Sequence, residues 1–433
     1  VRHEPRVAGA PNLFHVSSLG APAALFNRWR REGDEDGLAT EPYVPGPIRP
    51  LAFWRDLAVV DDVPPGSPMY YGAASLGGAQ LDECDLSTGG EPSGGALAVF
   101  IDGLEVPADR ILCKQLSTWE APPPGSDRVA VDVRLGRIAF APDADVGDVT
   151  VEYHSGFSGD VGGGPYDRRR PLDDDMTRRW GPDTVVAPDA LGTAPITVGA
   201  VAQDHTSIAD AVTEWQFGVA PLPPVVIHVV DDRTYVEDID IDVAQATHVV
   251  VQGANLRRPT LLGDITITGD QPDAVVRIDG LVVEGRLRVE GNVGLVVVRH
   301  CTFVPGVALD EDGEPALPAE PSIVADVAAD DISLEIDVES SIVGPIRVPL
   351  ECELVTVRRS IVDGLERLGG AAAYARIGTD GESAGPITVI ESTILGPVHA
   401  RRMPYASEAI FTGVVRVERT QEGCVRFSYI PPG

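Results

Sequence analysis

The second half of this 433-residue chain is a succession of short apolar runs that are rich in Val and Ile and end at Gly, Asn or Asp. From about residue 191 onward the runs include VVIHVV, THVVVQG, DITITG and AVVRIDGLVVEG. Continuously apolar runs are typical of parallel strands that are buried on both faces. One short run cannot bury its own side chains, so successive runs must stack on one another. We therefore expect residues 191–433 to form a parallel β-helix.

The later runs also resemble one another. HCTFVPG, SSIVGP, RSIVDG and ESTILGP each place a small polar residue before an apolar pair and a Gly. These polar residues are Thr302, Ser341, Ser360 and Thr393, and the gaps between them are 39, 19 and 33 residues. Coils of about 20 residues accommodate these gaps if some carry inserts, such as ALDEDGEPALPAEP and LGGAAAYARIGTDGESAG. We predict about eight to ten coils, right-handed because parallel crossovers almost always are.

One stretch near the start of this region has helical rather than strand periodicity. In TSIADAVTEWQ, the side chains of Ile208, Val212 and Trp215 fall on one face at spacings of four and three. The spacing predicts an amphipathic helix near residues 207–216. Such a helix would cover the open end of the β-helix and block edge pairing.

Residues 96–160 have the pattern of a small antiparallel β-sandwich. Asp102-Gly103 lies between two apolar runs and predicts a hairpin, and Leu135-Gly136 predicts a second one. The following residues 161–190 are rich in Gly, Pro and charge, so we expect a flexible linker there.

Residues 1–95 are rich in Pro and Gly and show no sustained period. We expect an extended or irregular docking segment whose Trp54, Tyr70 and Tyr71 find burial on the sandwich or on a neighbouring subunit. Trp54 lies in LAFWRDL, a candidate short helix. The predicted fold class is thus mainly β: a right-handed parallel β-helix preceded by a small antiparallel β-sandwich and an irregular N-terminal segment.

Charge and cysteine content exclude several function classes. The net charge of −32 would repel phosphate backbones, so nucleic acid is not an expected partner. The five cysteines are odd in number and form no CxxC pair, which argues against a disulfide framework or a zinc site. No apolar run approaches the roughly 18 residues of a membrane helix, and residues 1–14 lack the apolar core of a secretory signal. We expect assembly in the cytoplasm.

The sequence offers no catalytic, cofactor-binding or metal-ligating residue that we would assign. Asp173–Asp175 and the acidic group Asp310, Glu311, Asp312 and Glu314 could bind Ca²⁺, but neither has the ligand spacing of an EF-hand loop, and solvated loops are the favoured interpretation. The eight histidines form no HxH or HExxH arrangement. His300 and Cys301 are adjacent on an expected strand and would point to opposite faces.

The segments DHTSIADAV, PPVVIHVVDDRTYVEDIDI and HVVVQGANLRRPTLLG resemble the opening of carbohydrate-esterase β-helices of the pectin methylesterase type. The resemblance covers about 65 residues, and it implies the fold. The matching residues are Tyr235, Glu237, Gly253, Arg258, Pro259 and Thr260.

The resemblance does not extend to that family's active site. The family's two aspartates lie in a Gln-Asp pair and in an Asp-Phe-Ile-Phe-Gly run, and neither run occurs at the corresponding place here. Gln203-Asp204 forms a Gln-Asp pair, but it precedes the predicted helix. We therefore expect no enzymatic activity on pectin-like polysaccharides.

Four further segments resemble proteins encoded with phage-tail-like contractile injection systems: PNLFHVSSLG, RVAVDVRLGRIAF, VTVEYHSGFSGDVGGGPYDRR and EGCVRFSYIPPG. This resemblance implies a structural, non-catalytic subunit of such a particle, associated with its baseplate or forming a fibre or spike, with other particle subunits as partners. The particle could be released or act at the cell surface. The alternative is a carbohydrate-active or glycan-binding β-helix protein. A second copy of the chain and a cell-surface glycan remain open as further partners.

Overall fold

The structure is a computed structural model. It describes residues 6–7, 10–17, 22–27, 46–58, 70–72, 95–154, 160–168, 194–200, 203–244, 246, 248–310, 313–327, 333–379 and 381–432. The chain divides into two compact units, which are described separately. Unit 1 comprises residues 1–157 and 310–314, and unit 2 comprises residues 158–309 and 315–433.

Unit 1 is the predicted small β-sandwich, made of one five-stranded and one three-stranded sheet. All strand pairs are antiparallel except the parallel pair β5–β6. Its elements, in sheet order, are β1 (Arg6–Val7), β2 (Ala10–His15), β7 (Arg137–Ala139), β6 (Val129–Asp132) and β5 (Ile111–Cys113), then β4 (Leu104–Glu105), β3 (Leu97–Ile101) and β8 (Val149–Tyr153), with α1 (Pro50–Ala58) and η2 (Ala108–Arg110) outside the sheets.

Both predicted hairpins are confirmed. Ile101 pairs with Leu104 across a two-residue turn, in which Asp102 (φ 50°) and Gly103 (φ 78°) are both left-handed. This is the backbone that matches the twist of the flanking strands. The second hairpin joins β6 to β7, and its left-handed residue is Gly136 (φ 56°).

The N-terminal segment contributes more to the sandwich than the sequence predicted. Strand β2 pairs with β7 inside the five-stranded sheet, so residues 10–15 are part of the fold and not a docking appendage. Tyr70 and Tyr71 are buried in the sandwich core, as predicted. Trp54 is not: α1 buries the preceding Phe53, and Trp54 remains 56% exposed.

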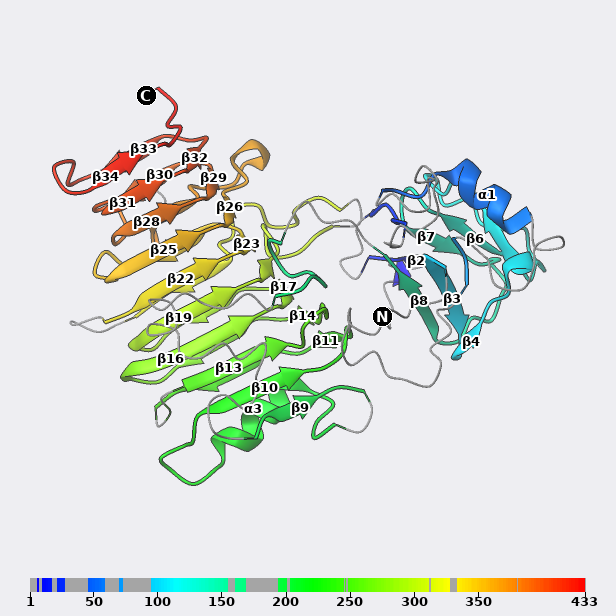
Figure 1. Ribbon diagram of the computed structural model, residues 1–433, viewed down its shortest axis with the longest axis horizontal. Coiled ribbons are helices and arrows are strands. Elements are labelled where there is room, and N and C mark those ends of the chain that lie inside the picture. Colours follow the sequence, from blue (N-terminus) through cyan, green and yellow to red (C-terminus); the bar gives the residue numbers. More distant parts are fainter. Residues whose placement is uncertain are drawn as a thin grey trace, which may run out of the picture. The chain divides into compact units, whose positions relative to one another are not determined.

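Unit 2 is a parallel β-helix, as the sequence predicted. Its strands form three sheets of ten, eight and eight strands, in which every neighbouring pair is parallel (Figure 1). The chain visits the three sheets in turn, which gives eight complete coils and the start of a ninth. The ten-stranded sheet contains β9 (Ile196–Val198), β10 (Val225–Val229), β13 (His248–Gly253), β16 (Gln271–Asp279), β19 (Val293–Arg299), β22 (Glu335–Glu339), β25 (Leu354–Arg358), β28 (Ile387–Ile390), β31 (Tyr405–Ser407) and β34 (Cys424–Arg426).

The two eight-stranded sheets complete each coil. The first contains β11 (Thr234–Val236), β14 (Thr260–Leu262), β17 (Val282–Glu284), β20 (Thr302–Phe303), β23 (Ile342–Val343), β26 (Ile361–Asp363), β29 (Thr393–Leu395) and β32 (Ile410–Phe411). The second contains β12 (Ile239–Asp242), β15 (Ile265–Thr268), β18 (Leu287–Val289), β21 (Ile323–Ala325), β24 (Ile346–Val348), β27 (Tyr374–Arg376), β30 (Val398–Ala400) and β33 (Val415–Val417). The short helix η3 (Glu366–Leu368) lies between β26 and β27.

The interior of the β-helix is filled by stacked aliphatic side chains. Because side chains alternate between faces along a strand, register places Val251 above Ile278, and Ile278 above Val298. All three are fully buried in one continuous core. Each strand therefore gains its burial from the coils on either side, as stacking requires.

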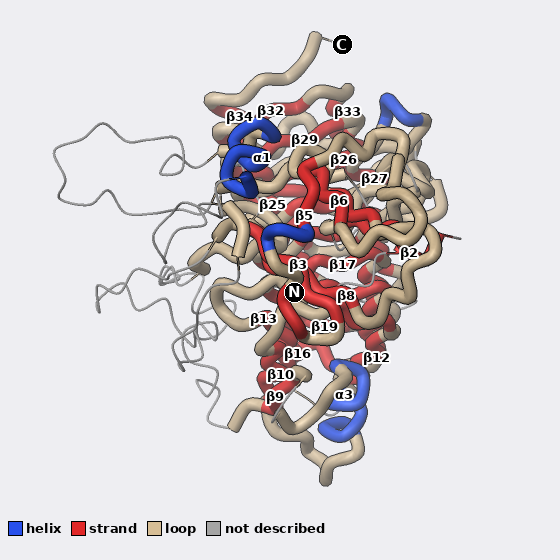
Figure 2. The backbone as a smooth tube through the Cα atoms, turned by 90° about the vertical axis from the view of Figure 1, so that its right-hand side faces the viewer, coloured by secondary structure: helices blue, strands red, loops and turns tan. Residues whose placement is uncertain are grey.

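The predicted helix is α3 (Ile208–Gln216), and it covers the β9 end of the β-helix (Figure 2). Its buried face includes Ile208, Val212 and Trp215, as the spacing predicted. Ser207 is the N-cap and accepts a hydrogen bond from the Asp210 N–H. The Glu237 carboxylate of the first coil accepts the Ile208 N–H at 2.7 Å, which fastens the helix to the coil.

Left-handed residues make the corners that lead out of the ten-stranded sheet. The residues are His300, Ser340, Arg359, Glu391, Glu408 and Phe427, each with φ between 46° and 56°. In three successive corners the next residue is a buried serine, Ser341, Ser360 or Ser392, and we call these three the serine ladder. The Ser360 hydroxyl donates to the Arg358 carbonyl at 2.7 Å and accepts the Ser341 N–H at 3.0 Å.

The repeat predicted from the sequence is therefore misaligned by one residue, relative to the corners of the structure, at two of its four positions. Cys301 and Ser392 occupy the places of the ladder, whereas Thr302 and Thr393 are the first residues of the next strands. The prediction of one of the two inserts is also partly wrong, because part of that segment is a strand. LGGAAAYARIGTDGESAG contains β27, which is a wall strand of its coil.

The serine ladder gives a stability prediction. Replacing Ser360 with Ala leaves the buried Ser341 N–H without its acceptor, which costs about 1–3 kcal/mol. The matched control is Ser428→Ala, because Ser428 accepts the Ala409 N–H in the same way but is only half-buried. Urea unfolding should show a clearly larger loss for Ser360→Ala. Equal losses would contradict the role given to the ladder.

Candidate functional site

The outward side of the ten-stranded sheet carries a row of buried polar residues. Register aligns Gln252 of β13 with Asp279 of β16, Arg299 of β19 and Glu339 of β22. All four are at most 2% exposed. We call these four residues the polar row. Buried charge is costly unless it is paired, so the partners of the row decide what it can do.

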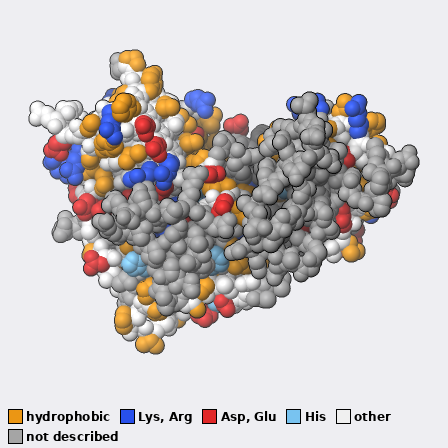
Figure 3. Space-filling model, viewed as in Figure 1, with side chains coloured by type: hydrophobic (Ala, Val, Ile, Leu, Met, Phe, Trp, Pro, Cys, Tyr) orange, Lys and Arg blue, Asp and Glu red, His pale blue; other side chains and the backbone are white. Residues whose placement is uncertain are grey.

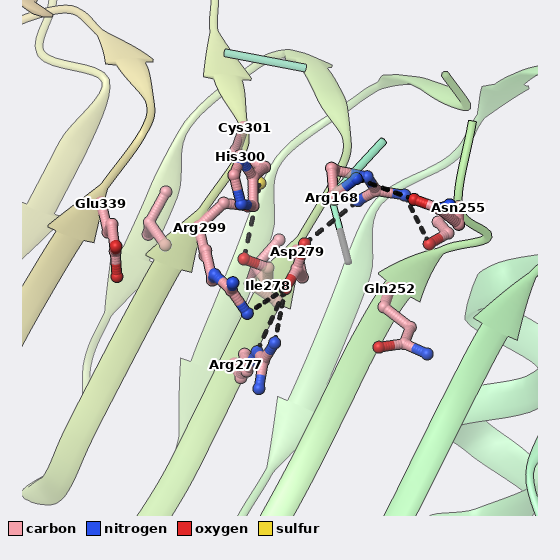
Figure 4. A network of polar contacts seen from close by, with 12 residues as sticks. Arg168, Gln252, Asn255, Arg277, Ile278, Asp279, Arg299, His300, Cys301 and Glu339 are labelled. Carbon is pink, nitrogen blue, oxygen red and sulfur yellow. Dashed lines mark hydrogen bonds and ion pairs between the residues drawn. The ribbon is translucent and has the colours of Figure 1, made fainter. Parts of the chain in front are cut away.

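Asp279 is the centre of this network (Figure 4). Arg168 donates from Nη1 to Oδ1 at 3.0 Å, and Arg277 donates from Nη2 to Oδ2 at 2.7 Å. Arg299 Nη1 lies 3.8 Å from Oδ2. Three guanidinium groups thus surround one carboxylate that is fully shielded from solvent.

Arg168 comes from a segment far away in the sequence. We call residues 160–168 the strap, because they lie along several coils of unit 2. Besides Asp279, the fully buried Arg168 side chain donates to the carbonyl oxygens of Gly253 at 2.7 Å and Ala254 at 2.6 Å. A Cβ atom at Gly280 would lie 1.3 Å from Arg168 Nη1, so only glycine leaves room for this guanidinium.

The rest of the strap bonds to later coils. The Gly163 N–H donates to the Thr302 hydroxyl at 2.9 Å, and the Gly162 N–H donates to the Ser340 carbonyl at 2.7 Å. The Tyr166 hydroxyl lies 2.8 Å from His300 Nδ1. The first eight residues of the predicted linker 161–190 are therefore anchored to the β-helix, which differs from the expected flexible joint. The remaining residues of that range, 169–190, lie outside the described residues.

Burial and charge act in opposite directions on the pKa of Asp279. Burial alone would raise this pKa, but the positive charges of Arg277, Arg299 and Arg168 outweigh it and hold the pKa well below its ordinary value. Burial also lowers the pKa of His300 to about 3, although the charge of Asp279 acts against this shift. Burial lowers the pKa of His228 to about 4. The network at neutral pH is thus an ionised carboxylate among guanidinium groups, with neutral imidazoles beside it.

This arrangement fastens the chain and offers no accessible reactive group. A general base must reach the proton that it abstracts, and a nucleophile must reach its substrate. Both oxygens of Asp279 are bonded to arginines, and the side chain is 0% exposed. Glu339 is likewise buried, and Arg359 pairs with it. The chemistry that the site supports is the locking of one segment onto another.

No residue of this network was predicted from the sequence. A signal was present: AVVRIDG places Arg277 and Asp279 in a run that was expected to be buried on both faces, where a charge needs a partner. The identity of Arg168 as that partner could not be read, because it lies 111 residues away from Asp279.

Of the acidic groups considered for Ca²⁺, the structure describes Asp310 and Glu314. Asp310 closes a tight turn, in which its Oδ1 accepts the Glu314 N–H at 2.9 Å. Glu311, Asp312 and Asp173–Asp175 lie outside the described residues. Within the described ranges, no group of three His, Cys, Asp or Glu side chains could hold a metal ion.

The other residues singled out in the sequence also have local roles. Asp204 of the Gln203-Asp204 pair accepts hydrogen bonds from Thr197, and thereby closes a turn before α3. His300 and Cys301 do point apart, but as a corner and not as a strand: His300 faces Tyr166, and Cys301 is buried in the core. The described cysteines Cys113, Cys301, Cys352 and Cys424 are free thiols.

Fold and network together define a parallel β-helix with a strap locked onto its largest sheet. Comparisons with protein-family models, with curated proteins and with solved structures find no match. No helix in the described part of the chain is long and apolar enough to cross a membrane.

The network predicts a specific loss of stability. Replacing Asp279 with Asn leaves three guanidinium groups around a neutral amide, and breaking a buried ion pair in this way costs about 3–5 kcal/mol. The matched control is Asp264→Asn, which removes the partially exposed pair with Arg288, worth about 0–1 kcal/mol. Chemical denaturation at pH 7 measures both losses.

The same variant predicts a pH dependence. Because the folded-state pKa of Asp279 is depressed, its contribution is fully present above the ordinary aspartate pKa of about 4 and is lost as pH falls further. The stability difference between the wild type and Asp279→Asn should therefore shrink below about pH 4. A difference that stays constant down to lower pH would contradict the depressed pKa.

Proposed function

We propose that this chain is a non-catalytic structural subunit of a larger assembly, and that the assembly is a phage-tail-like contractile injection particle. The observation that carries the structural role is the Arg168–Asp279 network, which joins the strap to the β-helix through fully buried charges. The assignment to a contractile particle rests on the resemblance of residues 11–20, 128–140, 149–169 and 422–433 to proteins encoded with such systems.

A ten-stranded sheet to which the strap is fixed by buried charges suits a subunit that transmits mechanical force. Releasing the strap would break the buried ion pair between Arg168 and Asp279 and the hydrogen bonds from Arg168 to two carbonyl oxygens, and the loss of one partner from a buried charge network is strongly unfavourable. The stacked coils add stiffness, because each coil is held by the hydrogen bonds and the packing of both neighbours. A stiff body with one closed face can transmit force between subunits without changing shape.

The segments that carry the resemblance occupy structural positions. Residues 11–20 include most of β2, and residues 128–140 include β6 and β7, which form one sheet with it. Residues 149–169 include β8 and the strap, and residues 422–433 include β34. Similar sequences at these places would preserve the sandwich, the Arg168–Asp279 network and the last strand, and not a catalytic centre.

The alternative is a carbohydrate-active or glycan-binding protein. A hydrolytic or eliminating enzyme needs a carboxylate that the polysaccharide can reach, and Asp279 and Glu339 are both buried. Binding without catalysis has one observation in its favour, since the aromatic rings of Phe427 and Tyr429 are exposed and could stack on a sugar. The overall negative charge disfavours nucleic acid as a partner. We place the protein in the cytoplasm during assembly, and afterwards in the particle.

The proposal predicts that the full chain sediments with particles. Particles from the source organism should carry the protein at a constant ratio to the sheath subunit through successive density gradients, since a structural subunit is held by a stable interface. Deleting the sheath gene should move the protein to the slow-sedimenting fractions. The measurement is quantitative immunoblotting across the gradient.

Two results would contradict this function. A protein that stays free and monomeric while intact particles sediment without it would remove the structural role. Release of methanol or reducing sugar from acidic polysaccharides by the purified protein, abolished by one carboxylate substitution, would establish the enzymatic alternative.

A further inference from the structure

The two ends of the β-helix differ. The β9 end is covered by α3, whose apolar face lies on the first coil. At the other end, β32, β33 and β34 are the outermost strands of their sheets, and in the described chain β34 pairs only with β31 (Figure 1). An outermost strand leaves backbone N–H and C=O groups that can pair with another chain.

Exposed apolar side chains gather at this open end. Of the fourteen large hydrophobic residues that are exposed in the described chain, six lie between residues 410 and 430. Figure 3 shows hydrophobic side chains at its upper left, the end at which β33 and β34 lie in Figure 1. Phe427 is the most exposed of them at 79%, and Tyr429 is 57% exposed. The six are Ile410, Val414, Val425, Phe427, Tyr429 and Ile430. We call them the end patch. A concentrated patch of this kind marks an interaction surface.

The charge of this end is opposite to that of the chain. Residues 401–433 hold five arginines and three glutamates, a net charge of +2, whereas the whole chain has a net charge of −32. Glu422 pairs with Arg402 and Arg419. Arg416 and Arg426 have no carboxylate partner among the described residues, and both are exposed on the outermost strands β33 and β34.

Arg426 is held in place without being neutralised. Its guanidinium carbon lies 5.2 Å from the centre of the Tyr405 ring and 5.7 Å from that of Phe427, and its Nε donates to the Ser407 hydroxyl. These contacts orient the positive charge beside the end patch. A fixed cation next to an aromatic anchor is the arrangement found at the centre of many protein interfaces.

From these observations we propose that the end patch binds an acidic, extended segment of a partner protein, which adds a strand beside β34. Main-chain hydrogen bonds to the open edge would supply affinity, and the end patch and the arginines would select apolar and acidic side chains in alternation. The inference deepens the proposed function by naming the chemistry of a partner subunit.

A second copy of the chain fits this end less well than an acidic partner. In a symmetric contact the same surface meets itself, so two ends of charge +2 would face each other. A glycan would use the aromatic rings but would leave the strand edge and the arginines without a role. Both occupants are therefore outcomes of the test.

The test uses the purified full chain and two labelled peptides of about eight residues, one alternating Glu with Val and the other alternating Lys with Val. Fluorescence anisotropy should show binding of the Glu peptide at least about tenfold tighter than that of the Lys peptide, weakening with salt. The double variant Arg416→Glu/Arg426→Glu should reverse this preference. The control is Arg134→Glu/Arg367→Glu, which makes the same charge change at two exposed arginines outside residues 401–433 and should bind as the wild type does.

A second variant separates binding from folding. Phe427 has a left-handed backbone (φ 49°), which Asn tolerates better than Phe, so Phe427→Asn should fold as well as the wild type. We expect it to weaken Glu-peptide binding about tenfold, since it removes the central anchor. Thermal unfolding checks that the fold is intact.

Three results would overturn the inference. The first is equal binding of both peptides, or binding of neither. The second is concentration-dependent self-association that the arginine variant abolishes, and the third is competition by a neutral oligosaccharide that depends on Phe427 alone.

Sedimentation separates this inference from the proposed function. If Arg416→Glu/Arg426→Glu sediments with particles as the wild type does, the inference fails and the structural role stands. If the wild type binds the Glu peptide but never sediments with particles, the structural role is contradicted and the binding of acidic segments by the end patch is supported.

Discussion

The ten-stranded sheet of this β-helix is buried on both faces in its middle coils, and much of the structure follows from that constraint. On the inner face, aliphatic side chains such as Ile278 satisfy it by stacking. On the outer face, alternation places Asp279 and Arg299 out of contact with water. Charges in that position require partners from elsewhere in the chain. Arg168 supplies one, so the strap is as much a part of the β-helix as its coils are.

The corners show how the backbone accommodates stacking. From β19 onward, each coil leaves the ten-stranded sheet through a sharp turn at one left-handed residue, and this conformation costs energy in a residue other than glycine. The serine that follows stabilises the turn: its hydroxyl bonds to its own corner and to the coil before it. Three successive corners repeat this arrangement, which helps to hold the coils that begin at β22, β25 and β28 in register.

Local pattern was sufficient to predict the elements that depend on local chemistry. The apolar runs predicted the coils, the spacing of Ile208, Val212 and Trp215 predicted the capping helix, and Asp102-Gly103 predicted a hairpin. The errors have physical causes. Several corners place two small polar or sulfur residues side by side, as in Cys301-Thr302, so the repeat was shifted by one residue. Helix α1 buries Phe53 and leaves Trp54 in solvent. The size of an aromatic side chain does not by itself decide which face of a helix packs against the core.

The strap could not be predicted, because its role depends on contacts between residues more than a hundred positions apart. The Gly-rich sequence around Gly162 is typical of a flexible linker when read by itself. The same glycines allow close approach to the coils: a Cβ at Gly163 would lie 2.5 Å from the Leu281 carbonyl oxygen. A composition that permits flexibility and one that permits tight packing look alike until the partner surface is known.

Arg168 locks the strap onto the β-helix, and hydrogen exchange of an Arg168→Met variant measures whether the strap opens without it. Methionine keeps much of the side chain's volume and removes its charge, so the lock is lost with little change in size. We expect much faster exchange of the Gly162 and Gly163 amides, which donate to the coils in the wild type, while the amides of β28 and β31 keep their protection. Unchanged exchange of the strap amides in a folded Arg168→Met protein would contradict this role of Arg168.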